Sequence, residues 1–212
     1  MSDAVTGVIL AGGTSSRMGE NKALVSIAGR PAIAHVHALL SAVFPSVCVM
    51  TNHPEEFAFL GIPLYRDCFS NAGPLAGVHA ALVEAQTEAI FVTACDLPLM
   101  SEEMVRYLAG YPTRHPITLA SAGGFIHHLF GLYSRACIPQ AERRLRDAAR
   151  APSEGRGRTK HACSLQSLSR SLGAEIIDAE ALPFYSHDLF YNMNSPEDLA
   201  YVRERLCRRV EN

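Results

Sequence analysis

Seven apolar runs of strand length recur along the sequence, and longer segments with helical periodicity separate them. The runs span residues 5–10, 47–51, 62–65, 89–94, 117–120, 129–133 and 174–177. Strands that alternate with helices are typical of βαβ units, whose crossovers are right-handed. The runs at 5–10 and 89–94 are almost unbroken in apolar character, as expected of parallel strands with helices on both faces. The sequence therefore predicts an α/β fold.

Three predicted helices are marked by their first residues. Pro31 and Pro74 stand at expected first helical positions, because proline lacks the N–H group that a first turn leaves unpaired. Apolar residues follow each proline at three- and four-residue steps. Near the C-terminus, Ser195 is a predicted N-cap, Pro196 the first helical residue and Asp198 the acid three residues after the cap. We therefore predict a helix that closes the chain.

The charged residues are nearly balanced, with 19 Lys and Arg against 21 Asp and Glu among 212 residues. Such a chain lacks the strong field that suits a nucleic-acid or anionic-membrane partner. The first apolar run stops at Gly12, which is too early for a signal peptide or a membrane span. We therefore expect a cytoplasmic protein with no nucleic-acid and no membrane partner.

The length favours a single domain, residues 1–212. Segment 151–161 contains Gly, Arg and Lys but almost nothing apolar, which indicates a mobile basic loop. The roughly 50 residues after it are too few for an independent domain, so we expect them to complete the same sheet. Six scattered cysteines without a Cys-x-x-Cys pair indicate reduced thiols and no zinc site.

A glycine-rich segment, LAGGTSSRMGENK at residues 10–22, follows the first predicted strand, at the edge where α/β sheets bind ligands. Gly12 and Gly13 allow backbone N–H groups to approach an anion, while Arg17 and Lys22 supply positive charge. Neither common phosphate fingerprint, G-x-x-x-x-G-K-[ST] or G-x-G-x-x-G, fits these residues, which argues against a kinase or a dehydrogenase. The segment predicts a loop for the phosphates of a nucleoside triphosphate. The alternative is a tight turn with solvated basic side chains.

Asp96 follows the apolar run IFVTAC, so its carboxylate is expected to face the same crevice as the glycine-rich segment. Mg²⁺ is usually held by one or two carboxylates together with substrate phosphates and waters. Asp96 is therefore the predicted metal ligand, with Mg²⁺ as the expected ion and Mn²⁺ as a substitute. Taken alone, an aspartate at a strand exit is more often a turn or cap residue.

Asp67 lies at the end of an extended run and precedes the helix predicted to start at Pro74. With Gly73 before it, this helix start exposes backbone groups that could bind the edge of a nucleobase. A helix start that needs small residues for close packing explains the same pattern equally well.

In combination, these segments resemble the molybdenum cofactor guanylyltransferases, which make molybdopterin guanine dinucleotide. The family pattern matches as LAGG-x-S-x-RMG-x-x-K at 10–22, G-x-P at 29–31, GPLAG at 73–77, CD-x-P at 95–98 and N-x-N-x-P at 192–196. The first segment alone also fits the wider group of nucleotidyltransferases, but the matches occur in order and span most of the chain. The resemblance implies a three-layer, Rossmann-like nucleotidyltransferase fold around a mostly parallel, mixed central sheet.

The resemblance also implies the reaction, in which the terminal phosphate of molybdopterin attacks the α-phosphorus of GTP and pyrophosphate leaves. A phosphate nucleophile is already ionised at neutral pH, so no side chain needs to act as a base. Catalysis then depends on alignment and charge neutralisation by Arg17, Lys22 and the metal at Asp96.

The loop and the resemblance together give the expected contacts. The predicted nucleotide-binding residues are Leu10, Ala11, Gly12, Gly13, Lys22, Asn52, Asp67, Gly73, Pro74, Leu75 and Asp96. Gly73, Pro74 and Leu75 are assigned to the base; the role of Asn52 could instead fall to Met50, because this asparagine shifts among relatives. Asn192 and Asn194 are assigned to the pterin. Relatives commonly carry a His-Pro pair before the sixth strand, whereas this chain has His127 and His128 without a proline.

Other functions fit parts of the pattern. A cytidylyltransferase for the same pterin is disfavoured by GPLAG and by LAGG in place of LAAG, and a sugar-phosphate nucleotidyltransferase is a further alternative. An adaptor that only delivers the cofactor would not need both Lys22 and Asp96. As partners we expect GTP, molybdopterin and transient contacts with other cofactor-biosynthesis or acceptor proteins, and as oligomeric state a monomer or weak homo-oligomer.

Overall fold

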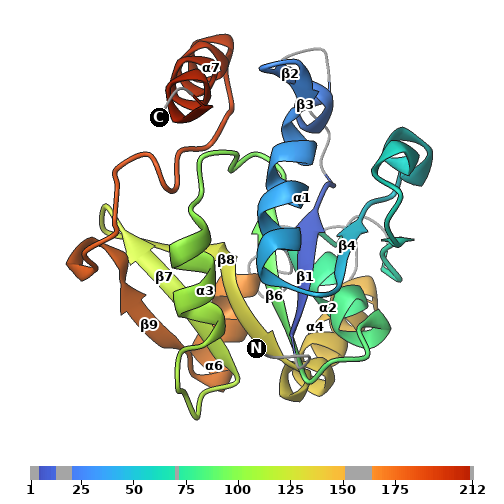
Figure 1. Cartoon of the computed structure of the whole chain (residues 1–212). Coiled ribbons are helices and arrows are strands. Elements are labelled where there is room, and N and C mark those ends of the chain that lie inside the picture. The colour runs from blue at the N-terminus through green and yellow to red at the C-terminus, as the bar shows by residue number, and fades with distance from the viewer. Residues whose placement is uncertain (1–4, 13–20, 70–71, 151–163, 211–212) are drawn as a thin grey trace.

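The computed structural model describes residues 5–12, 21–69, 72–150 and 164–210. Within these residues, a seven-stranded sheet has the order β5-β4-β1-β6-β8-β7-β9 (Figure 1). Its strands are β1 (Val5–Leu10), β4 (Val47–Met50), β5 (Leu64–Tyr65), β6 (Ala89–Ala94), β7 (Ile117–Ala122), β8 (Phe125–Ser134) and β9 (Glu175–Asp178). β1 is parallel to β4 and β6, β4 to β5 and β7 to β9, whereas β8 is antiparallel to β6 and β7. The predicted mostly parallel, mixed sheet is confirmed.

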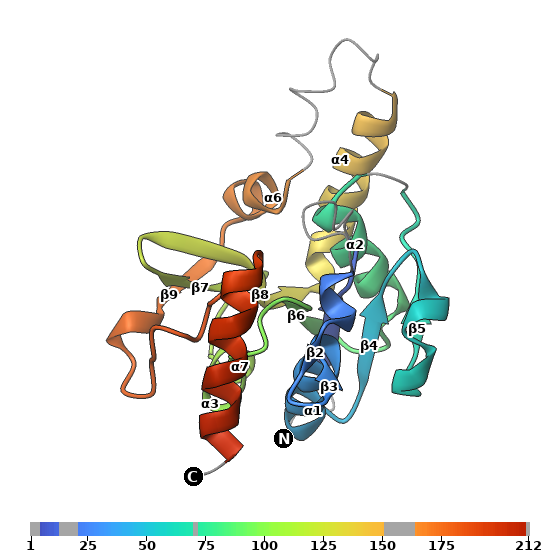
Figure 2. The same ribbon diagram turned by 90° about the horizontal axis from the view of Figure 1, so that it is seen from above.

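Helices cover both faces of this sheet (Figures 1 and 2). α1 (Ala32–Val43) and α3 (Glu102–Ala109) pack on one face, and α2 (Pro74–Glu84), α4 (Ile138–Arg150) and α6 (Leu165–Leu172) pack on the other. Short 3-10 turns are η1 (Lys22–Leu24), η2 (Pro54–Glu56), η3 (Ala58–Leu60), η4 (Arg135–Cys137) and η6 (Ala179–Ala181). The three-layer arrangement predicted from the sequence is therefore confirmed.

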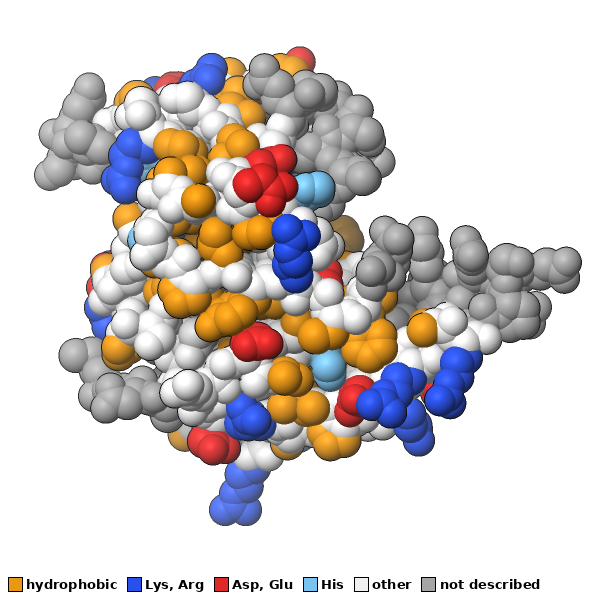
Figure 3. Space-filling view, turned by 90° about the vertical axis from the view of Figure 1, so that its right-hand side faces the viewer, with side chains coloured by type: hydrophobic (Ala, Val, Ile, Leu, Met, Phe, Trp, Pro, Cys, Tyr) orange, Lys and Arg blue, Asp and Glu red, His pale blue; other side chains and the backbone are white. Residues whose placement is uncertain are grey.

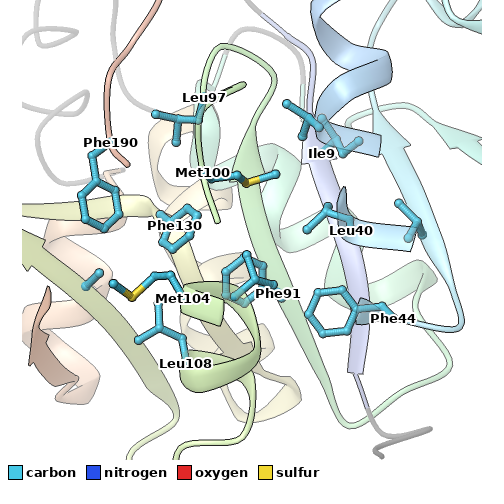
Figure 4. Packing of buried hydrophobic residues seen from close by; sticks show 14 of the residues in the cluster. Ile9, Leu40, Phe44, Phe91, Leu97, Met100, Met104, Leu108, Phe130 and Phe190 are labelled. Carbon is cyan, nitrogen blue, oxygen red and sulfur yellow. The ribbon is translucent and has the colours of Figure 1, made fainter. Parts of the chain in front are cut away.

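Aromatic rings join the centre of the sheet to its neighbours on the α1–α3 face (Figure 4). Phe91 of β6 stacks on Phe44 at a centroid distance of 5.6 Å and meets Phe130 of β8 edge-on at 5.2 Å. Phe130 in turn meets Phe190 edge-on at 5.1 Å. Every residue of β1 is buried, as expected of a parallel strand that helices cover on both faces.

The last helix, α7 (Pro196–Val210), lies beyond the edge of the sheet where β1 and β4 end, beside the short hairpin of β2 (Ser26–Ile27) and β3 (Arg30–Pro31) (Figure 1). A small cluster that includes Ile27, Leu99, Met193 and Val202 holds helix and hairpin together. Nη2 of Arg203 also donates to the Ser26 carbonyl oxygen at 2.9 Å. Segments from both ends of the chain therefore meet at this edge.

The predicted helix starts agree with the structure at two of three places. Pro74 and Pro196 are first helical residues, and the Asp198 carboxylate and Ser195 hydroxyl cap α7 reciprocally, as predicted. Pro31 was expected in the first turn of α1, but it pairs with Ser26 in β3 and has an extended ψ of 145°. The prediction for Pro31 was wrong because a two-residue strand leaves no periodic signal in the sequence.

The strand predicted at residues 129–133 is longer and has a different connection. It extends over Phe125–Ser134 as β8 and forms an antiparallel hairpin with β7, through Gly123 and Gly124 at positive φ. A βαβ unit was expected from the alternating pattern, and the hairpin replaces it at this position. The strand predicted at 62–65 contains only Leu64–Tyr65.

No helix in the described ranges is long and apolar enough to cross a membrane. On the face seen in Figure 3, both basic and acidic side chains occur, with hydrophobic side chains between them.

Candidate active site

A cleft of about 960 Å³ opens where β1, β4 and β6 end. It is lined by Leu10, Gly12, Met50, Thr51, Asn52, His53, Asp67, Gly73, Pro74, Gly77, Ala94, Cys95, Asp96, Leu97, Ile126, His127, His128, Leu129 and Asn192. Parallel α/β sheets bind ligands at this edge, so the cleft is the expected place for an active site. We call one side the β1–α2 wall, which comprises Leu10, Gly12, Asn52, Asp67, Gly73 and Pro74. The opposite side, residues 126–129, is the β8 wall.

Most of the sequence-predicted site residues that the structure describes line this cleft. They are Leu10, Gly12, Asn52, Asp67, Gly73, Pro74, Asp96 and Asn192, and the alternative Met50 lines it as well. Ala11, Lys22, Leu75 and Asn194 are not among the lining residues. Leu75 is fully buried in the core, so it supports the start of α2 and presents no exposed surface to the cleft. Gly13, Arg17 and the basic segment 151–161 lie outside the described residues.

On the β1–α2 wall, small residues bring a helix start close to a carboxylate. Gly73, at φ +70°, is the N-cap residue of α2, and its carbonyl oxygen accepts the Ala76 N–H group at 3.0 Å. A Cβ at Gly77 would lie 3.1 Å from the Leu10 side chain and 3.5 Å from Oδ1 of Asp67. The Asp67 N–H donates to Oδ1 of Asn52 at 3.4 Å. Glycine at 77 therefore leaves room for Leu10 and Asp67 against the first turns of α2.

Asp96 lies between the two walls, because β6 is flanked by β1 and β8. Burial raises the pKa of Asp96, while a backbone hydrogen bond and the charge of Lys22 act in the opposite direction. Its Oδ1 atom is buried and has no hydrogen-bond partner in the described part of the chain. A buried carboxylate oxygen without a donor is costly unless a cation or a proton compensates it. The residue therefore has the properties of a ligand for a hard cation such as Mg²⁺.

The described residues contain no group of three or more His, Cys, Asp or Glu side chains that could hold a metal by themselves. Mg²⁺ needs no such group, because it usually keeps several waters and binds through one or two carboxylates plus substrate phosphates. A single carboxylate at the cleft thus fits a metal that arrives with a triphosphate.

Lys22 starts η1, directly after Asn21, whose side chain accepts the Ala23 N–H group at 3.1 Å. Its Nζ donates to Oδ1 of Asn194, 172 positions further along the chain, at 2.6 Å. The Met193 N–H donates to the Asp96 carbonyl oxygen at 3.1 Å. The structure therefore links the separately predicted Lys22 and Asn194 to the segment next to Asp96, the one of the three that lines the cleft.

An irregularity in β8 shapes the β8 wall. Gly131 pairs with Leu119 of β7, but the next pair along is Ala120 with His127, so residues 128–130 have no partner on β7. Such bulges bend a strand and re-aim its side chains. Gly131 is required at its position, because a Cβ there would lie 2.3 Å from the Thr118 carbonyl oxygen.

The bulge is held by buried aromatic residues and presents two imidazoles to the cleft. The Tyr133 hydroxyl donates to the His128 carbonyl oxygen at 2.7 Å, and the His127 ring stacks on Phe190 at 4.0 Å with an interplanar angle of 13°. Nε2 of His127 and Nδ1 of His128 are buried without a hydrogen-bond partner among the described residues. Burial lowers the pKa of both rings, which favours neutral imidazoles with one donor and one acceptor each.

Sequence reasoning missed one residue of this region, Asp198, which it assigned only to the helix cap. Its Oδ1 accepts the Tyr191 hydroxyl at 2.8 Å, and its Oδ2 accepts the N–H groups of Asn194 and Ser195, both at 2.8 Å. These hydrogen bonds, that from Tyr191 foremost, lower the pKa of Asp198. In the sequence, only the four-residue spacing between Asn194 and Asp198 could have indicated that Asp198 also accepts the Asn194 N–H group.

The sequence matches the family described as the MobA-like NTP transferase domain over residues 7–160. It is 35% identical over 208 residues to the molybdenum cofactor guanylyltransferase of Rhodobacter capsulatus, covering 95% of this chain and 96% of that protein. It is 31% identical over 201 residues to the molybdenum cofactor guanylyltransferase of Desulfosudis oleivorans, covering 93% of each chain.

The fold is similar to that of molybdopterin-guanine dinucleotide biosynthesis protein A from Archaeoglobus fulgidus. The TM-score is 0.77 at 19% identity, over 96% of this chain and 99% of that structure. On the sequence match and the relatives together, the chain belongs to the MobA-like NTP transferase family and is a nucleotidyltransferase.

Proposed function

We propose that this enzyme transfers GMP from GTP to molybdopterin, forming molybdopterin guanine dinucleotide and pyrophosphate. The observation that carries the proposal is the convergence of Asp96 and the start of α2 on one cleft, with the charge of Lys22 close enough to act on Asp96. The similarity to the guanylyltransferases of Rhodobacter capsulatus and Desulfosudis oleivorans, which extends over nearly the whole of each chain, supports this choice of substrates.

The nucleotide would occupy the β1–α2 wall. The exposed backbone of Gly73 and Pro74, where α2 starts, is suited to the polar edge of guanine. Leu10 and Gly12 would lie beneath the nucleoside, and Asp67 and Asn52 are within the same wall for its polar groups. Ala11 would contribute through its backbone, and Leu75, which is fully buried, would support the start of α2 from the core.

Asp96 would hold Mg²⁺, or Mn²⁺ in its place, and a bound divalent ion would neutralise charge on the triphosphate. Lys22 would provide a second positive charge close to Asp96. The two groups are near enough for the charge of Lys22 to lower the pKa of Asp96. Arg17 is proposed to act with Lys22 on the phosphates. Oriented positive charge of this kind stabilises a transition state in which negative charge moves onto the leaving pyrophosphate.

Molybdopterin would bind along the β8 wall and Asn192. His127, His128 and the Asn192 amide offer hydrogen-bond donors and acceptors for a fused heterocycle, and the His127–Phe190 stack adds a flat apolar surface. The pterin phosphate would attack the α-phosphorus, and the bond to pyrophosphate would break. No histidine has to remove a proton, because the attacking phosphate is already ionised.

The proposal is tested by incubating the full chain with Mg²⁺, molybdopterin and each of GTP, CTP, ATP and UTP, and measuring pyrophosphate and dinucleotide. We expect turnover with GTP to exceed that with CTP by at least about 100-fold, because the wrong base would leave polar groups on α2 unpaired. Equal or faster turnover of CTP would indicate a cytidylyltransferase. Binding of GTP without pyrophosphate release would instead indicate an adaptor. We expect the active form to be a monomer or weak homo-oligomer.

A further inference from the structure

The Lys22 ammonium is oriented by a neutral group. In the described part of the chain, Lys22 forms no ion pair within 4.0 Å, and its Nζ donates to the Asn194 amide oxygen at 2.6 Å. A lysine side chain loses much rotamer entropy when it is fixed, so a flexible ammonium needs a partner to stay in one place. An amide oxygen orients the ammonium without neutralising its charge, whereas a carboxylate would compete with phosphate for that charge. Asn194 thus suits a lysine that must remain available to an anion.

Asn194 in turn is held by Asp198. A capping box requires that the acid in the first turn accept the N–H group of the N-cap residue, here Ser195. Asp198 makes two further contacts that the cap does not need: Oδ2 also accepts the Asn194 N–H group, and Oδ1 accepts the Tyr191 hydroxyl, each at 2.8 Å. One carboxylate therefore joins both ends of the short segment 191–195.

The middle of this segment is fixed by the core and by the strand exit. The Met193 side chain is fully buried in the cluster beneath α7, and its N–H group donates to the Asp96 carbonyl oxygen. With the backbone fixed at Met193 and Asn194, the Asn194 side chain is left to project toward Lys22. The segment consequently connects the first turn of α7 to Lys22 and Asp96.

We propose that Asp198 is a positioning residue for phosphate transfer: through the Asn194 backbone it fixes the amide that holds the Lys22 ammonium in place with its charge intact. This inference rests on the proposed function, because it assigns Lys22 to the phosphates of the nucleotide. Asp198 itself is not among the residues that line the cleft. Its effect must therefore pass through Asn194 and Lys22.

The test is a double-mutant cycle between Asp198→Ala and Lys22→Ala in the full chain. Guanylyl transfer gives kcat and KM, and calorimetry gives the affinity for Mg²⁺·GTP. We expect Asp198→Ala to lower kcat/KM for GTP by about 10- to 100-fold, because small displacements of a catalytic charge are costly. In the Lys22→Ala background, the same substitution should cause no further loss, because residues that act as one unit are not additive.

Two further variants separate positioning from helix capping. Ser195→Ala removes the other half of the cap but leaves the link between Asp198 and Asn194, so its melting temperature should fall while its rate stays close to that of the wild type. Asp198→Asn should recover much of the rate lost in Asp198→Ala. Its amide oxygen can accept the two N–H groups, and its NH₂ group can donate to the Tyr191 hydroxyl.

The inference is overturned if Asp198→Ala lowers kcat/KM for GTP by the same factor with and without Lys22. It is also overturned if Ser195→Ala lowers kcat/KM as much as Asp198→Ala does. A wild-type chain that transfers no GMP to molybdopterin would contradict the proposed function instead. In that case the same cycle, measured by Mg²⁺·GTP affinity, still decides whether Asp198 acts through Lys22.

Discussion

The two walls of the cleft are built in different ways. On the β1–α2 wall, each residue comes from a short local motif: the exit of β1, of β4 or of β5, or the glycine-proline start of α2. On the β8 wall, the side chains face the cleft because β8 bulges against β7, and the bulge is supported by Tyr133 of the same strand and by Phe190, which is distant in sequence. The first wall combines glycine and proline with Leu10 and the polar side chains of Asn52 and Asp67, and the second consists of imidazole and apolar side chains.

This difference is consistent with the two substrates we propose. A nucleoside triphosphate is recognised largely through its phosphates and the polar edge of its base, for which backbone N–H groups at a helix start are well suited. A pterin requires a shaped surface with hydrogen-bonding side chains, and such a surface depends on packing between elements. Variation in the acceptor would therefore be accommodated on the β8 wall, whereas the β1–α2 wall is constrained by its motifs.

The largest effect is expected for Asp96, which lies between the walls and should serve both substrates. Asp96→Asn keeps the size and one oxygen but removes the charge that a hard cation prefers. We expect kcat to fall at least about 100-fold, with little change in the melting temperature. High Mg²⁺ should restore part of the rate if the metal site is weakened.

The assay is guanylyl transfer titrated with Mg²⁺, beside a melting curve for each protein. Asparagine replaces aspartate well at turns and caps, so a variant with normal turnover at ordinary Mg²⁺ would show that Asp96 has only a structural role. Loss of both the melting transition and the activity would assign Asp96 to the fold.

Substitutions on the β8 wall should have an intermediate effect on the kinetics. This effect should be confined to KM for the acceptor, molybdopterin. His127→Phe retains the stack on Phe190 but removes the ring nitrogens, and His128→Ala removes the second imidazole. Each should raise KM for molybdopterin by about tenfold, the cost of one or two lost hydrogen bonds, and leave KM for GTP unchanged. His115→Ala, at an exposed histidine that pairs with Glu175, is the matched control. A rise in KM for GTP would contradict the division between the two walls.

The same contrast explains how much of the molecule the sequence predicts. The buried β1, the exposed start of α2 and the cap of α7 depend on residues within a few positions, so local patterns were sufficient for them. Lys22 and Asn194 were each identified, but their contact spans 172 positions and could not be inferred from either motif. The β8 bulge depends on how close Gly131 comes to Thr118, and β2 and β3 are too short to show periodicity. The roles given to Gly13 and Arg17 stay predictions.

The smallest expected effect is on the free energy of unfolding at acidic pH. It tests whether α2, which supports the β1–α2 wall, is destabilised by acid. His79 lies in α2 with only 5% of its surface exposed, edge-on to Phe69, and both ring nitrogens lack a partner among the described residues. Burial lowers the pKa of His79 from its ordinary 6.5; Glu142 opposes this shift and Arg146 adds to it. Below about pH 6.5 the unfolded chain therefore binds a proton that the folded chain does not, and the free energy of unfolding falls as the pH decreases toward the lower, folded-state pKa.

His79→Leu removes this proton uptake, so the variant should lose less stability than the wild type between about pH 7.5 and about pH 5, by up to about 1.4 kcal/mol for each unit of pKa displacement. Urea unfolding at the two pH values measures the difference, and the other histidines cancel because both proteins contain them. Parallel pH dependence in the two proteins would mean that His79 gains a proton in the folded state as readily as in the unfolded chain. A smaller loss in the variant would instead identify the helix that supports the β1–α2 wall as an acid-sensitive element, independent of His127 and His128 on the opposite wall.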